Sequence, residues 1–271
     1  MNQYTQIEFQ HITAEQSDIL IAELSIIGFN GFEENENTLK AFIPSADFDE
    51  AAVEKIAEKN AVTFTKSDIE ETNWNAVWEA NFQPVVVDDF VGIRADFHEP
   101  IKGVEYEIVI TPKMSFGTGH HATTYMMIQQ MRKIDFRNKN VFDFGTGTGI
   151  LAILAEKLGA AKIVAIDYDE WSITNTAENL ERNHCSKSVL KQADNANGEE
   201  QYDVILANIN KNVILDNLPA LVKQLAPDGI LLLSGLLASD EADIKSAASN
   251  FSVSLGEKTT QNNWIAIRFT R

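Results

Sequence analysis

The chain has 271 residues, of which 44% are hydrophobic, as expected for a globular protein of one large or two smaller domains. Its formal net charge is −18 and its pI is about 4.6. This charge argues against a nucleic acid as the main partner, because nucleic-acid-binding proteins normally present a basic face. It favours a cationic partner, although an acidic chain can also simply be kept soluble by its charge.

Cysteine content and the N-terminus indicate a reduced, cytoplasmic setting. Cys185 is the single cysteine, so neither an internal disulfide nor a cysteine metal cluster can form. The first 16 residues contain neither the basic nor the apolar segment of a secretory signal, and no apolar run is long enough to span a bilayer. We therefore expect a cytoplasmic protein without a membrane partner.

Residues 1–69 predict a small α+β domain. The apolar spacing predicts a strand, a helix with Thr13 as N-cap, two strands around an Asn-rich turn, a helix and a strand, at 4–10, 13–29, 31–44, 47–60 and 62–69. The order βαββαβ is that of a ferredoxin-like fold, in which two helices cover one face of the sheet.

Residues 70–84 predict a helical linker. Trp74 and Trp78 are four residues apart and would share one face of a short helix. Two interpretations stay open for this pair. It packs the linker against a domain, or it offers a stacking surface to a substrate.

Residues 85–271 predict a larger α/β domain. Two strand segments (85–97 and 106–112) and a helix (120–134) come first. Five short apolar runs then alternate with helical patterns that begin near Ile150, Glu170, Lys211 and Ser239. Such alternation is typical of a doubly wound, mostly parallel sheet with helices on both faces. Two further strands within 251–270 would pair antiparallel at one edge, which predicts a seven-stranded sheet with an antiparallel edge strand.

A glycine-rich turn follows the first of these apolar runs. Gly145, Gly147 and Gly149 alternate with two threonines, and glycine lets a ligand approach the backbone closely at the N-terminus of the next helix. Ile150 breaks the G-x-G-x-x-G spacing of dinucleotide-binding proteins, and the G-K-[ST] of a Walker loop is absent. A tight turn with a purely structural role is the alternative.

Two acidic residues flank this turn. Asp167 ends the next strand, 22 positions after Gly145, where an acid can accept both hydroxyls of a ribose. Asp143 precedes the turn and can orient it or hold a ligand ammonium group. These groups suit an adenosine-type ligand without a diphosphate, and S-adenosylmethionine fits. We therefore expect Asp143, Gly145, Gly147 and Asp167 to bind this cofactor.

Three segments resemble the PrmA family, the bacterial ribosomal protein L11 methyltransferases. They read "TPKMSFGTGHHATT", "VFDFGTGTGILAILAEKLGAAKIVAIDYD" and "VILANI", at 111–124, 141–169 and 204–209. Many methyltransferases share the glycine motif, whereas "FGTGHHATT" beside "ANI" is more specific. The small N-terminal domain and the linker also match the family's layout, so the resemblance spans nearly the whole chain.

This resemblance implies a Rossmann-like, class I S-adenosylmethionine-dependent methyltransferase. The implied reaction methylates lysine ε-amines and the N-terminal α-amine of ribosomal protein L11, with the N-terminal domain holding that substrate. The implied cofactor contacts are Thr124, Gly145, Asp167 and Asn208.

The chain departs from the family pattern in two places. His120-His121-Ala122 stands where the family commonly has T-H-P, and Thr111-Pro112-Lys113 stands where it often has D-P-G. The missing proline leaves the first of these turns less rigid.

Asn208 is the expected catalytic residue. Methyl transfer to an amine is an in-line displacement, so aligning a neutral amine lone pair should dominate the rate enhancement. The side-chain carbonyl of an asparagine at a strand end can accept an amine N–H without favouring the cationic amine as a carboxylate would. In the alternative interpretation, Asn208 or Asn210 caps the following helix.

Other residues near these motifs have open roles. Phe116 and Gly117 would line the entry path of the amine, or they only pack within the loop. His120 and His121 lack a third ligand, so we expect no metal and a contact with the cofactor loop instead. Asp194 would lie near the adenine or be an exposed loop acid.

Three other functions compete with this one. Glutamine N-methyltransferases resemble N-P-P-Y where this chain has Asn208-Ile209-Asn210-Lys211, and a small-molecule amine is a related alternative. A nicotinamide oxidoreductase would need the missing glycine and a hydride-site pair. A non-catalytic binding module is disfavoured by the intact loop with Asp167 and Asn208. We expect a monomer that acts on a protein and not directly on nucleic acid.

Overall fold

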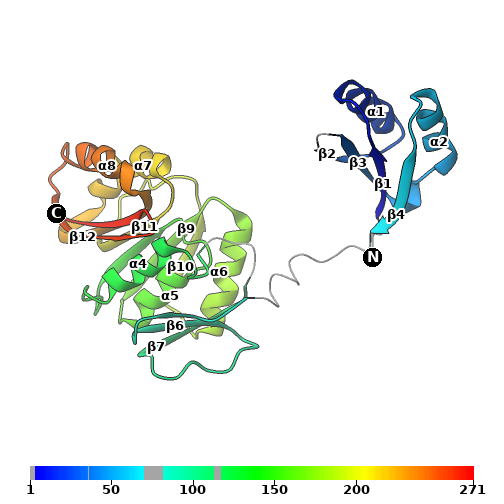
Figure 1. Ribbon diagram of the computed structural model, residues 1–271. Helices are drawn as coiled ribbons and strands as arrows, with labels where there is room; N and C mark the ends of the chain where they lie inside the picture. The colour runs from blue at the N-terminus through cyan, green and yellow to red at the C-terminus, as the bar shows by residue number, and fades with distance from the viewer. Residues whose placement is uncertain (1–3, 36, 70–81, 113–116) are drawn as a thin grey trace. The chain divides into compact units, whose positions relative to one another are not determined.

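The computed structural model describes residues 4–35, 37–69, 82–112 and 117–271, and the chain divides into two compact units, Met1–Val77 and Trp78–Arg271 (Figure 1). The predicted helical linker, with Trp74 and Trp78, falls largely outside the described residues. Within these residues, no helix is both long enough and apolar enough to cross a membrane.

The small unit is an antiparallel sheet with two helices. Its elements are β1 (Tyr4–Gln10), α1 (Ala14–Ile26), β2 (Gly31–Asn35), β3 (Thr38–Pro44), the short 3-10 helix η1 (Ser45–Asp47), α2 (Glu50–Lys59) and β4 (Phe64–Ile69). The strand order is β2-β3-β1-β4. Thr13 is the predicted N-cap of α1: its hydroxyl accepts the Gln16 N–H at 3.2 Å, and the Gln16 side chain accepts the Thr13 N–H at 3.0 Å.

Strand alternation determines which face of this sheet is covered. Ile7 and Phe9 of β1 are fully buried, together with Leu39 and Ile43 of β3 and Leu20 of α1. Successive strand side chains point to opposite faces, so these residues lie on the face that the helices cover. The predicted elements of the first 69 residues are therefore present in the predicted order.

The larger unit contains the alternating strands and helices that the sequence predicts. Its elements are β5 (Val85–Val87), β6 (Val91–Ala95), β7 (Tyr106–Ile110), α4 (Ala122–Met131), β8 (Asn140–Phe144), α5 (Ile150–Lys157), β9 (Lys162–Asp167), α6 (Glu170–Arg182), β10 (Ser188–Gln192), β11 (Tyr202–Asn208), α7 (Lys211–Lys223), β12 (Leu225–Leu237), the 3-10 helix η2 (Ala238–Asp240), α8 (Glu241–Ala248), β13 (Ser254–Gln261) and β14 (Trp264–Thr270).

In the described part of this unit, seven strands form a mixed sheet in the order β10-β9-β8-β11-β12-β14-β13. The first five strands pair in parallel. β14 pairs antiparallel with both β12 and β13, so the strand at the very edge, β13, runs in the same direction as the parallel strands. The sequence predicts the antiparallel hairpin correctly, but the antiparallel strand lies one position inside the edge, because β14 and not β13 inserts beside β12.

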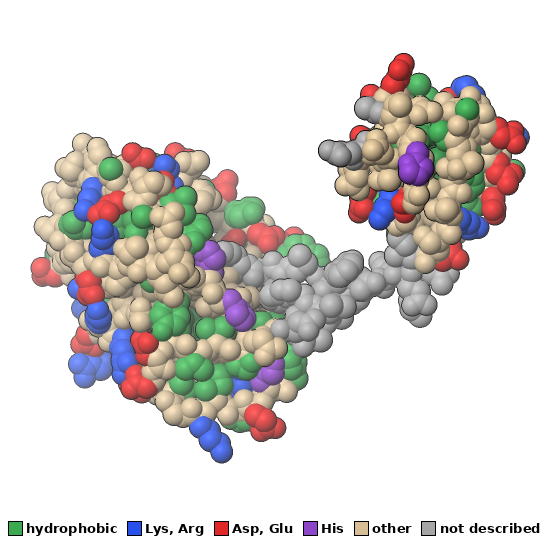
Figure 2. Space-filling model, viewed as in Figure 1, with side chains coloured by type: hydrophobic (Ala, Val, Ile, Leu, Met, Phe, Trp, Pro, Cys, Tyr) green, Lys and Arg blue, Asp and Glu red, His purple; other side chains and the backbone are tan. Residues whose placement is uncertain are grey.

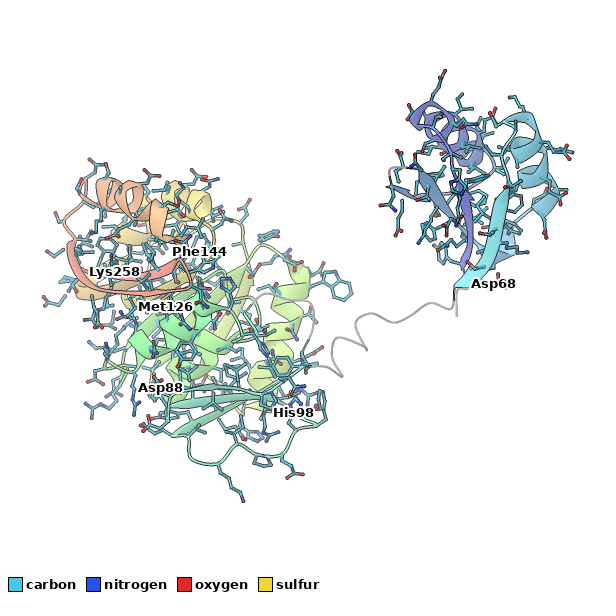
Figure 3. The ribbon with its side chains drawn as sticks, viewed as in Figure 1. Asp68, Asp88, His98, Met126, Phe144 and Lys258 are labelled. Atoms are coloured by element: carbon cyan, nitrogen blue, oxygen red, sulfur yellow. The ribbon has the colours of Figure 1, made fainter. Side chains whose placement is uncertain are left out.

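Helices cover both faces of this sheet (Figure 1). One core contains α4, α5 and α6, and the other contains α7 and α8. Consecutive residues of β8 contribute to opposite cores, Val141 to the first and Phe142 to the second. Met126 of α4 is buried against the sheet, and Phe144 ends β8 at its carboxyl edge (Figure 3).

The strands β5, β6 and β7 form a separate sheet, which packs against the helices of the first core (Figure 1). Its Ile93, Ile108 and Ile110 side chains are fully buried and belong to that core. The sequence predicts strands in this region but does not indicate that they form their own sheet. Side-chain pattern alone does not say which strands pair.

Candidate active site

A cavity of about 520 Å³ lies at the carboxyl edge of the parallel strands. β8 and β11 are neighbours there although the chain goes from β8 to β9, so the strand order reverses between them, which is where open α/β sheets bind ligands. The cavity is lined by His121, Phe144, Gly145, Gly147, Asp167, Tyr168, Asp169, Ser172, Ala193, Asp194, Asn208, Ile209, Asn210, Val213, Gly235 and Trp264.

The glycine turn between β8 and α5 takes backbone conformations that other residues rarely adopt. Gly145 has φ of 78° and Gly149, the N-cap of α5, has φ of 82°. A Cβ at Gly145 would collide with the Ile209 side chain, and one at Gly149 would lie 2.7 Å from Thr176 Cγ2. Both positions therefore require glycine, for backbone and for steric reasons.

Backbone N–H groups hold the side-chain carboxylate of Asp167 beside this turn. The Gly147 N–H donates to Asp167 Oδ2 at 2.9 Å, and the Asp169 N–H donates to Oδ1 at 3.1 Å. The carboxylate is 8% exposed and lines the cavity. Since two carboxylate oxygens offer about four acceptor positions, Asp167 can still accept hydrogen bonds from a ligand.

Asp143 lies beneath the turn rather than in the cavity. Its side chain is fully buried, and the Thr146 hydroxyl donates to its Oδ2 at 2.7 Å. Desolvation by burial raises the pKa of Asp143 to about 7; the nearby charge of Asp167 acts in the same direction, and the Thr146 hydrogen bond opposes both. Of the two roles that the sequence leaves open for Asp143, this position favours orienting the turn.

Asn208 ends β11 at the cavity, 7% exposed. Its Nδ2 donates to Thr124 Oγ1 of α4 at 3.1 Å, whereas its Oδ1 has no hydrogen-bond partner among the described residues. The helix cap belongs to Asn210, whose side chain accepts the Val213 N–H at 3.2 Å. The structure thus decides which asparagine caps the helix: Asn210 caps α7, and Asn208 does not.

The segment before α4 is bound to the glycine turn. The Thr148 hydroxyl donates to the Gly117 carbonyl at 2.7 Å. Gly117, Thr124, Gly145 and Asn208 together line a second, narrow cavity of about 20 Å³. The structure therefore brings Gly117 and Thr124 to the other predicted site residues, while Phe116 lies outside the described residues.

The two adjacent histidines have different surroundings. His121 lines the large cavity, caps α4 by accepting the Thr123 N–H, and lies edge-on to Trp264 with ring centroids 4.6 Å apart. The His120 ring instead contacts Phe82, with centroids 4.9 Å apart. Among the described residues, no group of three or more His, Cys, Asp or Glu side chains is placed to hold a metal ion.

Several lining residues were not predicted from the sequence, and Trp264 and Gly235 are the clearest cases. Both lie beyond Asn208 along the strand order, on β14 and β12. Trp264 is 56 residues from Asn208 in the chain, so no local motif connects them. Its position at the start of a strand, directly after the polar turn Asn262-Asn263, is the single sequence signal that was available.

Comparison with solved structures defines the class of protein. The crystal structure of the ribosomal protein L11 methylase from Lactobacillus delbrueckii subsp. bulgaricus is 28% identical, with a TM-score of 0.65. The match covers 70% of this chain and 99% of that one. The fold of the chain is accordingly that of an α/β methyltransferase, with a mixed seven-stranded sheet in its described residues.

The chain belongs to the ribosomal protein L11 methyltransferase (PrmA) family, whose model matches residues 3–271. The ribosomal protein L11 methyltransferase of Porphyromonas gingivalis is 41% identical over 261 residues, which are 93% of this chain and 90% of that relative. Its counterpart from Bacteroides thetaiotaomicron is 36% identical over 266 residues, 95% of each chain. The family resemblance seen in the sequence motifs is confirmed.

Proposed function

We propose that this enzyme transfers methyl groups from S-adenosylmethionine to ribosomal protein L11, at lysine ε-amines and the N-terminal α-amine. L11 as the substrate is supported by the relatives, which are described as ribosomal protein L11 methyltransferases. The observation that carries the chemistry is the pairing of Asn208 with Thr124 at the cavity, with Asn208 Oδ1 unpartnered among the described residues. A buried amide oxygen without a partner costs free energy unless a ligand hydrogen bond compensates it.

The lining of the cavity fits S-adenosylmethionine. Asp167 would accept the ribose hydroxyls, and the turn at Gly145 and Gly147 would lie against the amino-acid part of the cofactor. A Cβ at Gly235 would collide with the Ile209 backbone, so β12 and the segment after β11 approach as closely as glycine permits. Thr124 would contact the cofactor beside Asn208. Asp143 would stabilise the conformation of the glycine turn. When bound, the cofactor supplies an electrophilic methyl group on a sulfonium.

The residues of the chain then act on the amine. A free lysine has a pKa of about 10.4, so its neutral form must be stabilised in the site. Asn208 Oδ1 would accept one amine N–H and direct the lone pair at the methyl carbon. Because Asn208 is neutral, it does not favour the ammonium form. The amine would take the methyl group, which leaves the cofactor as a neutral thioether, and water would take the proton that the lysine ammonium loses.

The rings of His121 and Trp264 would bound the amine side of the cavity. Trp264 lies past Asn208 in the strand order, away from Asp167, and the His121 ring contacts it edge-on. The lysine stem needs an apolar wall on this side of the cavity. Gly117 would lie at the entry to this part of the site, because it lines the narrow cavity beside Asn208. Phe116 stays a predicted substrate contact.

The small unit would be a ferredoxin-like substrate-recognition domain of residues 1–69, joined by a linker of residues 70–84 to a methyltransferase domain of residues 85–271. Its element order and its strand order β2-β3-β1-β4 support this assignment. A ribosomal protein as substrate is consistent with a monomeric cytoplasmic enzyme that acts on the protein and does not bind nucleic acid directly. The net charge of −18 favours such a lysine-bearing partner.

Mass spectrometry tests this proposal. Purified ribosomal protein L11 is incubated with the enzyme and S-adenosylmethionine, and its amines are mapped. Gains in steps of one methyl group, about 14 Da each, are expected on lysine and N-terminal amines. An unmodified L11 with the cofactor still bound by calorimetry would exclude L11 as the substrate while retaining the methyltransferase. The alternative would then be another protein or a small-molecule amine.

A further inference from the structure

The loop and first turn that follow β9 expose two aromatic rings beside the cavity. Tyr168 is 76% exposed and Trp171 is 77% exposed. Neither side chain makes a ring contact or a hydrogen bond within the part of the chain that the structure describes. A tryptophan side chain left in water contributes no burial free energy to folding, and tryptophan is enriched at the centres of protein interfaces.

The backbone under these rings is held in place. Gln192 Nε2 donates to the Tyr168 carbonyl at 3.0 Å, and the Trp171 N–H donates to Asp169 Oδ1 at 3.2 Å in the N-cap of α6. Asp169 in turn donates its N–H to Asp167. The rings are therefore presented from a fixed backbone, so binding would order only their side-chain torsions.

The charge around the rings is negative. Glu170 and Asp194 are exposed and form no ion pair among the described residues. The nearest basic residue along β10, Lys191, lies 3.9 Å from Glu200 instead. An aromatic face beside carboxylates attracts Lys and Arg side chains, by cation–π and by Coulomb attraction.

The position of Trp171 beside the cavity also suits a protein partner. Asp169 and Ser172, which flank Trp171 in the chain, both line the cavity, whereas Trp171 does not. β9 and β11 are two strand spacings apart, roughly 10 Å. A standard interface covers roughly 800 Å² per partner, a disc of roughly 16 Å radius, which is wide enough for a protein whose amine reaches Asn208 to extend over the first turn of α6.

We infer that Tyr168, Trp171, Glu170 and Asp194 form a docking surface for the lysine-bearing face of the protein substrate. This inference rests on the proposed function and extends it, because it gives the methyltransferase unit a substrate contact of its own in addition to the small unit. Tyr168 and Asp194 line the cavity as well, so Trp171 is the residue that separates docking from cofactor binding.

The test compares Trp171→Ala with Phe97→Ala in the full chain. Phe97 is also an exposed aromatic residue, 56% exposed, but it does not line the cavity and lies against His98. Steady-state methylation of purified L11 gives kcat and KM, and calorimetry gives the affinity for S-adenosylmethionine. We expect Trp171→Ala to raise the KM for L11 about tenfold, with kcat and cofactor affinity unchanged, and Phe97→Ala to change none of them.

The other outcomes are distinct. A KM that changes no more in Trp171→Ala than in Phe97→Ala overturns the docking surface while L11 methylation stands. A loss of cofactor affinity with an unchanged KM would assign the ring to the cofactor and also overturn it. If the unaltered enzyme leaves L11 unmethylated, the proposed function fails, and the docking partner fails with it.

Discussion

The small unit and the larger unit differ most in their charge. Residues 1–69 contain 13 acidic and four basic residues, a net charge of −9, which is half of the −18 of the chain. Residues 82–271 contain 24 acidic and 18 basic residues, a net charge of −6 on a much longer segment. Acidic side chains gather along one edge of the small unit in Figure 2. Long-range attraction for a cationic partner is therefore concentrated in the unit that lacks Asp167 and Asn208.

Buried polar groups show the opposite distribution. In the described small unit, the buried polar side chains are Thr5 and Ser17, whereas the described part of the larger unit buries fifteen. Thr176 and Asn179 of α6, for example, bind the carbonyls of Gly147 and Thr148 at 2.7 and 2.8 Å. Buried polar networks are costly unless they are satisfied, and they fix one geometry when they are. Net negative charge is thus concentrated in the small unit, and buried polar contacts in the larger unit.

Removing residues 1–69 should have the largest effect on L11 methylation. If the small unit holds the substrate, its loss should lower kcat/KM for L11 about 100-fold. Without it, binding to the small unit no longer raises the effective concentration of L11 at the active site. Cofactor affinity, measured by calorimetry, should remain. Retained activity on L11 would show that the small unit has no recognition role.

Asn208→Ala and Asn210→Ala form a matched pair within the larger unit. Loss of the Asn208 carbonyl should lower kcat about 100-fold, because the amine is no longer aligned. Asn210→Ala removes the cap of α7 and should instead reduce the free energy of unfolding by about 1 kcal/mol with kcat nearly unchanged. Single-turnover methylation and urea unfolding separate the two effects. Equal losses of kcat in both variants would remove the catalytic assignment of Asn208.

Asp167→Asn tests the ribose contact. Losing hydrogen bonds to a charged carboxylate should weaken S-adenosylmethionine binding about 10-fold to 100-fold. Asp194→Asn, a change of the same charge at the same cavity, is the control and should have a smaller effect. Calorimetric titration of both variants gives the comparison. Unchanged affinity in Asp167→Asn would mean that this carboxylate only holds the turn through Gly147 and Asp169.

The substitution Asp143→Asn should change how the free energy of unfolding depends on pH, with the smallest effect on activity. Because the folded-state pKa of Asp143 is raised to about 7 from 3.8, the folded chain binds more protons than the unfolded chain between these values. The stability of the folded chain should therefore fall as pH rises through this window. The Asn variant lacks this titration, so its stability relative to the unaltered chain should increase between pH 6 and pH 8. Urea unfolding at both pH values checks it, and a constant difference would contradict the assignment.

Local signals were enough to predict most elements. The N-cap Thr13 and the helix starts at Ile150, Glu170 and Lys211 agree with the structure because caps and apolar spacing act within one helical turn. The position of β14 inside the edge was not predicted. A hairpin can insert either of its strands beside β12, and that choice depends on which face each strand buries across the whole sheet.

In the site, the glycine turn, the acid that ends β9 and the asparagine that ends β11 could be predicted from the sequence, because each lies in a short motif with its own chemistry. The tertiary structure alone decided which of these groups face the cavity: Asn208 but not Asn210 pairs with Thr124, and Asp143 is buried beneath the turn. It also brought Trp264 and His121 into the cavity from distant segments. Contacts between such segments follow from the packing of β14 beside β12 and of α4 against the sheet, and no local sequence pattern encodes that packing.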